Sequence, residues 1–78
     1  MPSLRSLSGR QVRAILAANG FVFVSQRGSH MKMQIAREDE EGVPGTRTVI
    51  VPDHGTIQLG TLISIIRQSG LDRALFEA

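Results

Sequence analysis

Cysteine, tryptophan and tyrosine are absent from this chain of 78 residues, and phenylalanine occurs only three times. Without cysteine the protein has neither disulfides nor thiolate metal ligands. The clearest apolar run, residues 21–24, is far shorter than the ~20 residues that span a bilayer. The first five residues, Met-Pro-Ser-Leu-Arg, lack the apolar segment of a signal peptide. We therefore expect a cytoplasmic protein with no membrane association.

The chain is also short, so we expect a single domain over residues 1–78. A domain of this size buries only about 60% of the surface that its unfolded chain exposes. Hydrophobic residues make up 41% of the sequence and its mean hydropathy is near zero. These values are typical of a globular domain rather than of a disordered tail. Its stability must come from a compact core, from a partner, or from both.

Lysine is scarce, because Lys32 is the only lysine among nine cationic residues. Four of the seven acids lie together in residues 38–41, and the rest of the chain carries an excess of six positive charges. Arginine presents a planar fork of donors that matches phosphate oxygens. This distribution favours a polyanionic partner such as nucleic acid. The alternative is a solvated surface of mixed charge.

The hydrophobic pattern predicts an α+β fold in the order helix, three strands, helix. We expect helices over 7–18 and 59–68, strands over 21–26, 29–37 and 47–51, and a short helical turn over 73–76. Ser8 and Gln11 predict a capping box at the first helix, and Gly20 and Gly70 follow the helices as stop signals. Strands joined by turns in this order predict a three-stranded antiparallel meander with two helices on one face.

The strand over residues 29–37 alternates in polarity. Met31 and Met33 point to one side, which we predict is the core, whereas His30 and Lys32 point to the other. His30 and Lys32 are therefore about 7 Å apart on one face, from the rise of a strand. Histidine is suited to acid–base chemistry because its imidazole takes up and releases a proton near neutral pH. The alternative is that both are solvated strand residues.

Arg27-Gly28 is predicted to be the two-residue turn before this strand. With that turn Ser25 pairs with His30, and Phe23 shares the face of His30, where it is exposed for base stacking or for docking of a partner. A three-residue turn reverses the assignment and buries the aromatic side chains. The sequence leaves both arrangements open.

His54, the second histidine, follows the third strand in Pro52-Asp53-His54-Gly55. In a meander, the end of the third strand lies at the same edge of the sheet as the turn before His30, which allows the two histidines to be close. His54 is a candidate second acid–base group or substrate contact, and the alternative is a loop histidine with a structural hydrogen bond. Two histidines and one aspartate are too few for a zinc site, so we predict no metal.

Several segments together resemble the HicA-type toxins, small mRNA interferases of type II toxin–antitoxin systems. They are Ser8-Gly9, Asn19-Gly20-Phe21, Gln26-Arg27-Gly28-Ser29-His30, Val51-Pro52-Asp53-His54-Gly55, Gly60-Thr61-Leu62 and the run over residues 65–71. The resemblance implies a fold like a double-stranded-RNA-binding domain and an endoribonuclease with His30 as catalytic residue. It also implies a HicB-type antitoxin that covers His30. The chain departs from the family pattern at Ser25, where a basic residue is frequent, and in the acidic run at 38–41.

RNA can be cleaved when its own 2′-hydroxyl attacks the adjacent phosphate, and a positioned acid or base accelerates such a step by roughly 10²–10⁴. The resemblance implies that His30 supplies one of the two proton transfers. We predict no cofactor. Arg27 and Lys32 would serve the phosphate, and Gly28 and Ser29 would shape the turn and contact the substrate. Arg10 and Arg67 are further candidates for backbone contacts. The rival hypotheses are a non-catalytic RNA-binding module and a protein-interaction subunit that has lost its activity.

Overall fold

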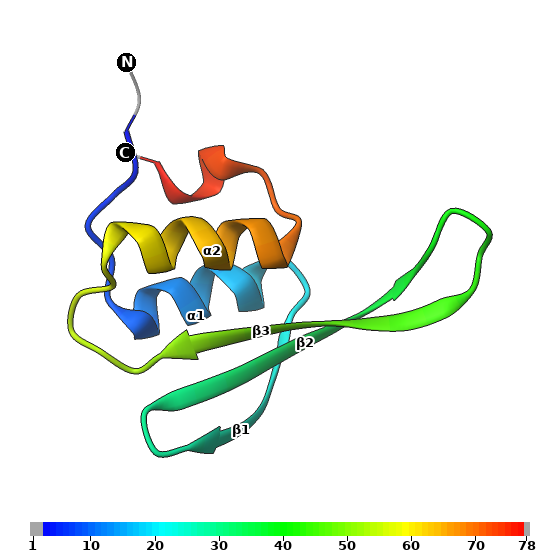
Figure 1. Cartoon of the computed structure of the whole chain (residues 1–78), viewed down its shortest axis with the longest axis horizontal. Helices are drawn as coiled ribbons and strands as arrows, with labels where there is room; N and C mark the ends of the chain where they lie inside the picture. Colours follow the sequence, from blue (N-terminus) through cyan, green and yellow to red (C-terminus); the bar gives the residue numbers. More distant parts are fainter. Residues whose placement is uncertain (1–2, 78) are drawn as a thin grey trace.

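Helices and strands follow one another in the order predicted from the sequence (Figure 1). The structure, a computed structural model, describes residues 3–77. Its elements are α1 (Gly9–Ala18), β1 (Val22–Arg27), β2 (His30–Glu38), β3 (Pro44–Pro52), α2 (Leu59–Ser69) and the 3₁₀ helix η1 (Arg73–Phe76). The predicted α+β fold is confirmed. The largest difference in bounds is at β3, which begins at Pro44 rather than at Arg47.

The ends of α1 are set by the residues that the sequence singled out. The Ser8 hydroxyl accepts a hydrogen bond from the Gln11 backbone N–H (3.1 Å), and the Gln11 side chain accepts one from the Ser8 N–H (2.8 Å). This reciprocal pair is the predicted capping box. It makes α1 begin at Gly9 rather than at Leu7. At the other end of α1, Gly20 has a φ of 97°, a conformation that glycine adopts at little cost.

The three strands form an antiparallel sheet in the order β1-β2-β3, as predicted. Met31 pairs with Val51 and Met33 pairs with Val49, and all four side chains are fully buried. Both helices pack on this face, where their buried side chains join one cluster: Val12, Leu16, Leu62 and Ile65. Burial of each such side chain contributes on the order of 1.5–3 kcal/mol. The opposite face of the sheet, which carries His30 and Lys32, is exposed.

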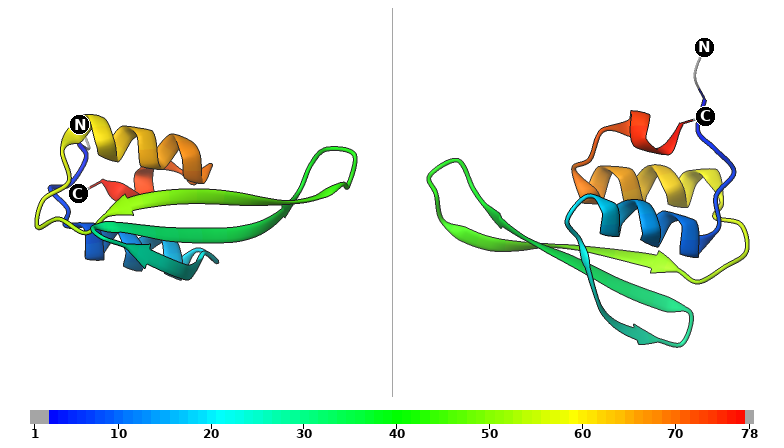
Figure 2. Two further views of the ribbon diagram at one scale, coloured as in Figure 1. Left: turned by 60° about the horizontal axis from the view of Figure 1, so that its bottom comes forward. Right: turned by 180° about the vertical axis from the view of Figure 1, so that it is seen from behind.

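The far end of the β2–β3 hairpin projects beyond the helices as an arm, and its residues 36–46 are all exposed (Figure 2). The strands run further than predicted, so the loop at the tip spans only 39–43 instead of 38–45. Within the tip the Asp39 side chain accepts hydrogen bonds from the backbone N–H groups of Glu41 (2.9 Å) and Val43 (2.8 Å). One acid of the acidic run therefore shapes the turn that carries Glu40 and Glu41, whereas Glu38 is the last residue of β2.

The turn between β1 and β2 differs from the prediction. It consists of Gly28 and Ser29, so that Arg27 pairs with His30. Gly28 has a φ of 59°, and no residue other than glycine has a positive φ among residues 3–77. A positive φ at the first turn residue alone is the pattern of a type II′ turn, which favours glycine there. The predicted Arg27-Gly28 turn is wrong because it would have put arginine at that position.

A β-bulge between Phe23 and Ser25 changes which face Phe23 occupies. Ser25 pairs with Lys32, not with His30 as expected, while Phe23 pairs with Met33. The extra residue returns Phe23 to the face that the helices cover. There the Arg13 guanidinium lies 4.0 Å from the centre of the Phe23 ring, a cation–π contact. Of the two arrangements that the sequence left open, the one in which Phe23 shares the face of His30 does not occur, and the bulge rather than a three-residue turn is the reason. Phe23 nevertheless remains 40% exposed.

Candidate active site on the open face of the sheet

The exposed face of the sheet carries a hollow of about 400 Å³ lined by Ser25, Arg27, His30, Lys32 and Ile50. The strand pairings explain why these five meet. Arg27 lies opposite His30, and Lys32 has Ser25 on one side and Ile50 on the other. Directly paired residues in antiparallel strands point to the same face. The structure thus brings together three of the predicted site residues, Arg27, His30 and Lys32, around one concave surface.

Gly28 and Ser29, also predicted for the site, form the turn that joins two residues of the hollow, Arg27 and His30. A Cβ on Gly28 would meet no atom within 4 Å, so this glycine is required by its φ of 59° and not by crowding. The Ser29 carbonyl accepts a hydrogen bond from the Asp53 N–H (2.6 Å). The turn is therefore tied to the end of β3 by its backbone.

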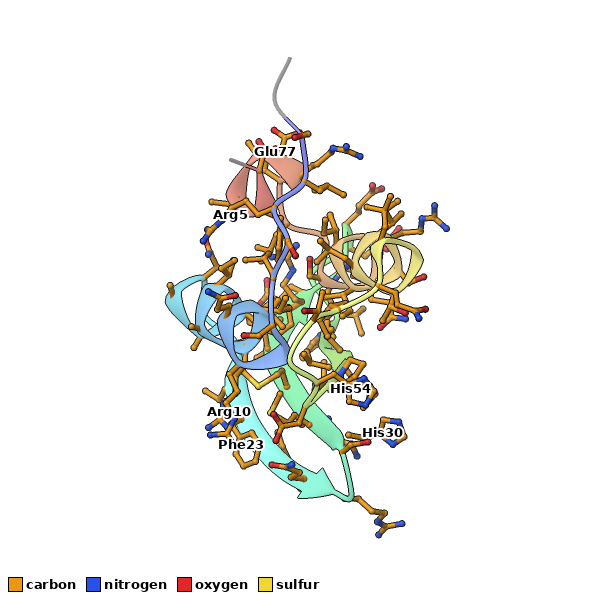
Figure 3. The ribbon with its side chains drawn as sticks, turned by 90° about the vertical axis from the view of Figure 1, so that its left-hand side faces the viewer. Arg5, Arg10, Phe23, His30, His54 and Glu77 are labelled. Carbon is orange, nitrogen blue, oxygen red and sulfur yellow. The ribbon has the colours of Figure 1, made fainter. Side chains whose placement is uncertain are left out.

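His54 does not line the hollow that contains His30. It lines a neighbouring hollow of about 250 Å³ with Pro52, Gln58 and Thr61, at the start of α2. The two histidines nevertheless project on the same side of the molecule (Figure 3), because Pro52, which pairs with His30, precedes His54 by only two residues. The His54 carbonyl accepts a hydrogen bond from the Gly9 N–H (2.8 Å). That backbone contact fixes the segment around His54 to the start of α1, and the His54 imidazole remains exposed.

Arg10 and Phe23 lie on the other side of the molecule from the imidazoles (Figure 3). Arg10 was a candidate for tracking the RNA backbone, but its guanidinium is paired with Asp53, with Nε 3.2 Å from Oδ1. Arg67, the other such candidate, is exposed in the last turn of α2 and lines neither hollow. Neither arginine adds to the cationic side chains around His30.

Asp53 is the residue that sequence reasoning missed. Its carboxylate accepts hydrogen bonds from Arg10 and from the Gln26 side chain (Nε2 to Oδ2, 3.1 Å). The bond from Arg10, followed by the bond from Gln26, holds the pKa of Asp53 below its ordinary value near 3.8. The same partnership raises the pKa of Arg10. The only signal in the sequence was the position of Asp53, directly before His54 in a segment already singled out.

The part of the chain that the structure describes contains neither a membrane-spanning helix nor a cluster of metal-binding side chains. Among residues 3–77, no helix is both long enough and apolar enough to cross a membrane. In the same range, histidine and acidic side chains nowhere gather in a group of three or more that could hold a metal ion.

The family model described as HicA toxin of bacterial toxin–antitoxin matches residues 9–71. The chain belongs to the HicA toxin family. The match runs from the start of α1 to just beyond α2 and includes both histidines. A comparison with curated proteins found no similar sequence. Membership of the HicA family makes this chain a toxin of a toxin–antitoxin system, with an antitoxin as its partner, and confirms the resemblance found in the sequence.

Proposed function

We propose that this HicA-family toxin is a metal-independent endoribonuclease that cleaves mRNA, with His30 as its acid–base residue. The observation that carries the proposal is the gathering of Arg27, His30 and Lys32 around one hollow on an open sheet face. A polyanionic strand can approach that face because none of the helices among residues 3–77 covers it. The cytoplasm, where mRNA is found, is the compartment that this function requires.

The proposed reaction needs only the RNA, the protein and solvent water. The 2′-hydroxyl oxygen bonds to the adjacent phosphorus while the bond from phosphorus to the 5′ oxygen breaks. The hydroxyl proton goes to a base, and the departing oxygen receives a proton from an acid. His30 supplies one of these two transfers and water supplies the other, which leaves a 2′,3′-cyclic phosphate and a 5′-hydroxyl. A positioned imidazole is worth roughly 10²–10⁴ in rate for such a step.

Arg27 and Lys32 supply positive charge on either side of His30. Arg27 is its cross-strand partner, and Lys32 is the next residue along β2 on the same face. We assign both to the phosphate, whose negative charge grows as the fifth oxygen bonds to phosphorus. Gly28 and Ser29 give the backbone of the turn its shape beside the substrate. His54 is assigned to a substrate contact from the neighbouring hollow.

The antitoxin is proposed to be of the HicB type and to cover His30. The open face offers it exposed apolar side chains near the cationic ones: Ile50 is 40% exposed and Val22 is 61% exposed. A protein seated there would exclude RNA and inhibit the toxin by occupying its site. Full cleavage activity after the toxin is mixed with its antitoxin would contradict this part of the proposal.

The test uses purified protein, a labelled RNA and the DNA of the same sequence, with a chelator present. We expect cleavage of the RNA only, with cyclic phosphate ends, and binding that weakens steeply with salt. Binding without cleavage at every salt and pH would favour the second candidate, a non-catalytic RNA-binding module that recognises shape and phosphates. Neither binding nor cleavage would leave only a protein-interaction subunit.

A further inference from the structure

The turn that precedes His30 is held by polar contacts rather than by packing. Residues 22–30 are all exposed, so no buried side chain anchors them. Instead, the two carbonyls of the turn are both engaged: Gln26 Nε2 donates to the Gly28 carbonyl (3.1 Å), and the Asp53 N–H donates to the Ser29 carbonyl (2.6 Å). Without these two bonds the turn would be fixed only by the strand pairing on either side of it.

Asp53 connects the turn to the rest of the domain. Its carboxylate accepts from Gln26 on β1 and from Arg10 on α1. The neighbouring backbone is close-packed: a Cβ at Gly9 would overlap the Pro52 carbonyl oxygen. One aspartate thus links α1, β1, the turn and the end of β3. We call this set of contacts the frame; it supports the turn from the side opposite His30.

Gln26 takes part from the face opposite His30. It pairs with Met31, whereas Arg27 pairs with His30. Its single amide nitrogen has two hydrogens and donates to two acceptors, the Gly28 carbonyl and the Asp53 carboxylate. A substrate on the His30 side has no access to this amide, so Gln26 acts on the reaction only through the turn.

We propose that Gln26 and Asp53 are positioning residues that clamp the β1–β2 turn and thereby fix His30 for cleavage. The expected effect on kcat rests on the proposed ribonuclease function, whereas the clamp itself rests only on the hydrogen bonds described above. Misplacement of a reacting group by about 1 Å costs about 10² in rate. A loosened turn therefore lowers kcat and leaves the binding of RNA by Arg27 and Lys32 largely intact.

The test compares Gln26→Glu with Gln26→Ala. The glutamate variant keeps the shape but replaces the donor by an acceptor that faces Asp53 and a carbonyl, whereas the alanine variant removes the donor without adding charge. At neutral pH we expect kcat to fall about 10–100-fold for the glutamate variant and less for the alanine variant, with KM changed by less than about threefold. Gln68→Glu, at an exposed position on α2, makes the same charge change away from the turn and should match the parent.

Two further readouts separate a positioning role from a general structural one. The kcat of Gln26→Glu should approach that of the parent as the pH is lowered, because the protonated carboxyl of the new glutamate again donates a hydrogen bond. The ratio of the kcat of Gln26→Ala to that of the parent should not change with pH. The Asp53 amide, which donates to Ser29, should exchange its hydrogen faster in both variants than in the parent. The inference would be overturned if Gln26→Glu and Gln68→Glu had equal kcat, or if the loss of kcat in Gln26→Glu were the same at every pH.

Amide exchange also distinguishes failure of this inference from failure of the proposed function. If the parent does not cleave RNA, the ribonuclease proposal fails, and faster exchange at Asp53 in the Gln26 variants would still support the clamp. Unchanged exchange at Asp53 would overturn the clamp whether or not the parent cleaves RNA.

Discussion

Gly9 begins α1 at the point where the helix meets the end of β3. An alanine there would place its Cβ onto the Pro52 carbonyl oxygen, 3.0 Å from the Pro52 carbonyl carbon and 3.1 Å from the His54 nitrogen. All three atoms belong to backbone, so no side chain can rotate away to make room. The helix must shift from the strand, and the hydrogen bond from the Gly9 N–H to the His54 carbonyl (2.8 Å) must lengthen.

Gly60 provides the matched comparison, because it also lies in the first turn of a helix. A Cβ there would meet no atom within 4 Å. Alanine is favoured over glycine in helices by about 0.5–1 kcal/mol, so Gly60→Ala should raise the free energy of unfolding by up to that amount. At Gly9 the overlap outweighs the same gain, because overpacking against fixed structure costs roughly 1–3 kcal/mol. Gly9→Ala should therefore destabilise the protein.

The assay is urea or thermal unfolding of the two variants beside the parent. In a domain of this size 1 kcal/mol corresponds to about 4–8 °C in Tm. Gly9→Ala should therefore unfold several degrees below the parent, and Gly60→Ala at or above the Tm of the parent. Equal stability of Gly9→Ala and Gly60→Ala would refute the close contact between α1 and the Pro52–His54 segment. The frame behind His30 depends on that contact.

Three other predictions concern the core, the charges of the site and pH. Phe76 in η1 is fully buried, so Phe76→Ala should cost about 3–5 kcal/mol in urea unfolding, and a loss below 1 kcal/mol would show that η1 is not part of the core. Arg27→Ala and Lys32→Ala should each reduce the slope of log affinity for RNA against log salt by about 1; an unchanged slope would remove that residue from the phosphate contacts. The lowered pKa of Asp53 means that its carboxylate stabilises the fold above its ordinary pKa and stops doing so as pH falls through the lowered value. Asp53→Asn should therefore be less stable than the parent at pH 7 by a gap that narrows below pH 3.8, and a gap independent of pH would contradict the ion pair.

The parts of this structure that sequence reasoning predicted are those governed by local rules. The capping box at Ser8, the glycine after α1 and the alternation that separates His30 and Lys32 from the methionines each depend on residues close together in the chain. Local rules failed at the β1–β2 hairpin. A bulge adds one residue without a sequence mark of its own, and it moved Phe23 to the other face of the sheet.

The network around Asp53 lay beyond the reach of the sequence for a different reason. Arg10 and Asp53 are 43 positions apart, and Gln26 and Asp53 are 27 apart. No periodicity or spacing pattern relates such residues, and they meet only because α1, β1 and the end of β3 pack together. The cationic residues around His30 were accessible to prediction because they lie on two adjacent strands joined by one turn.

The most direct test of the ribonuclease assignment is the rate at which purified His30→Ala cleaves RNA under single-turnover conditions, relative to the parent. His54→Ala serves as the matched imidazole control, since His54 lines the neighbouring hollow. We predict that loss of the His30 imidazole lowers the rate by roughly 10²–10⁴, while folding and RNA binding persist, and that loss of the His54 imidazole mainly weakens binding. Cleavage by His30→Ala at the rate of the parent would contradict the assignment of His30.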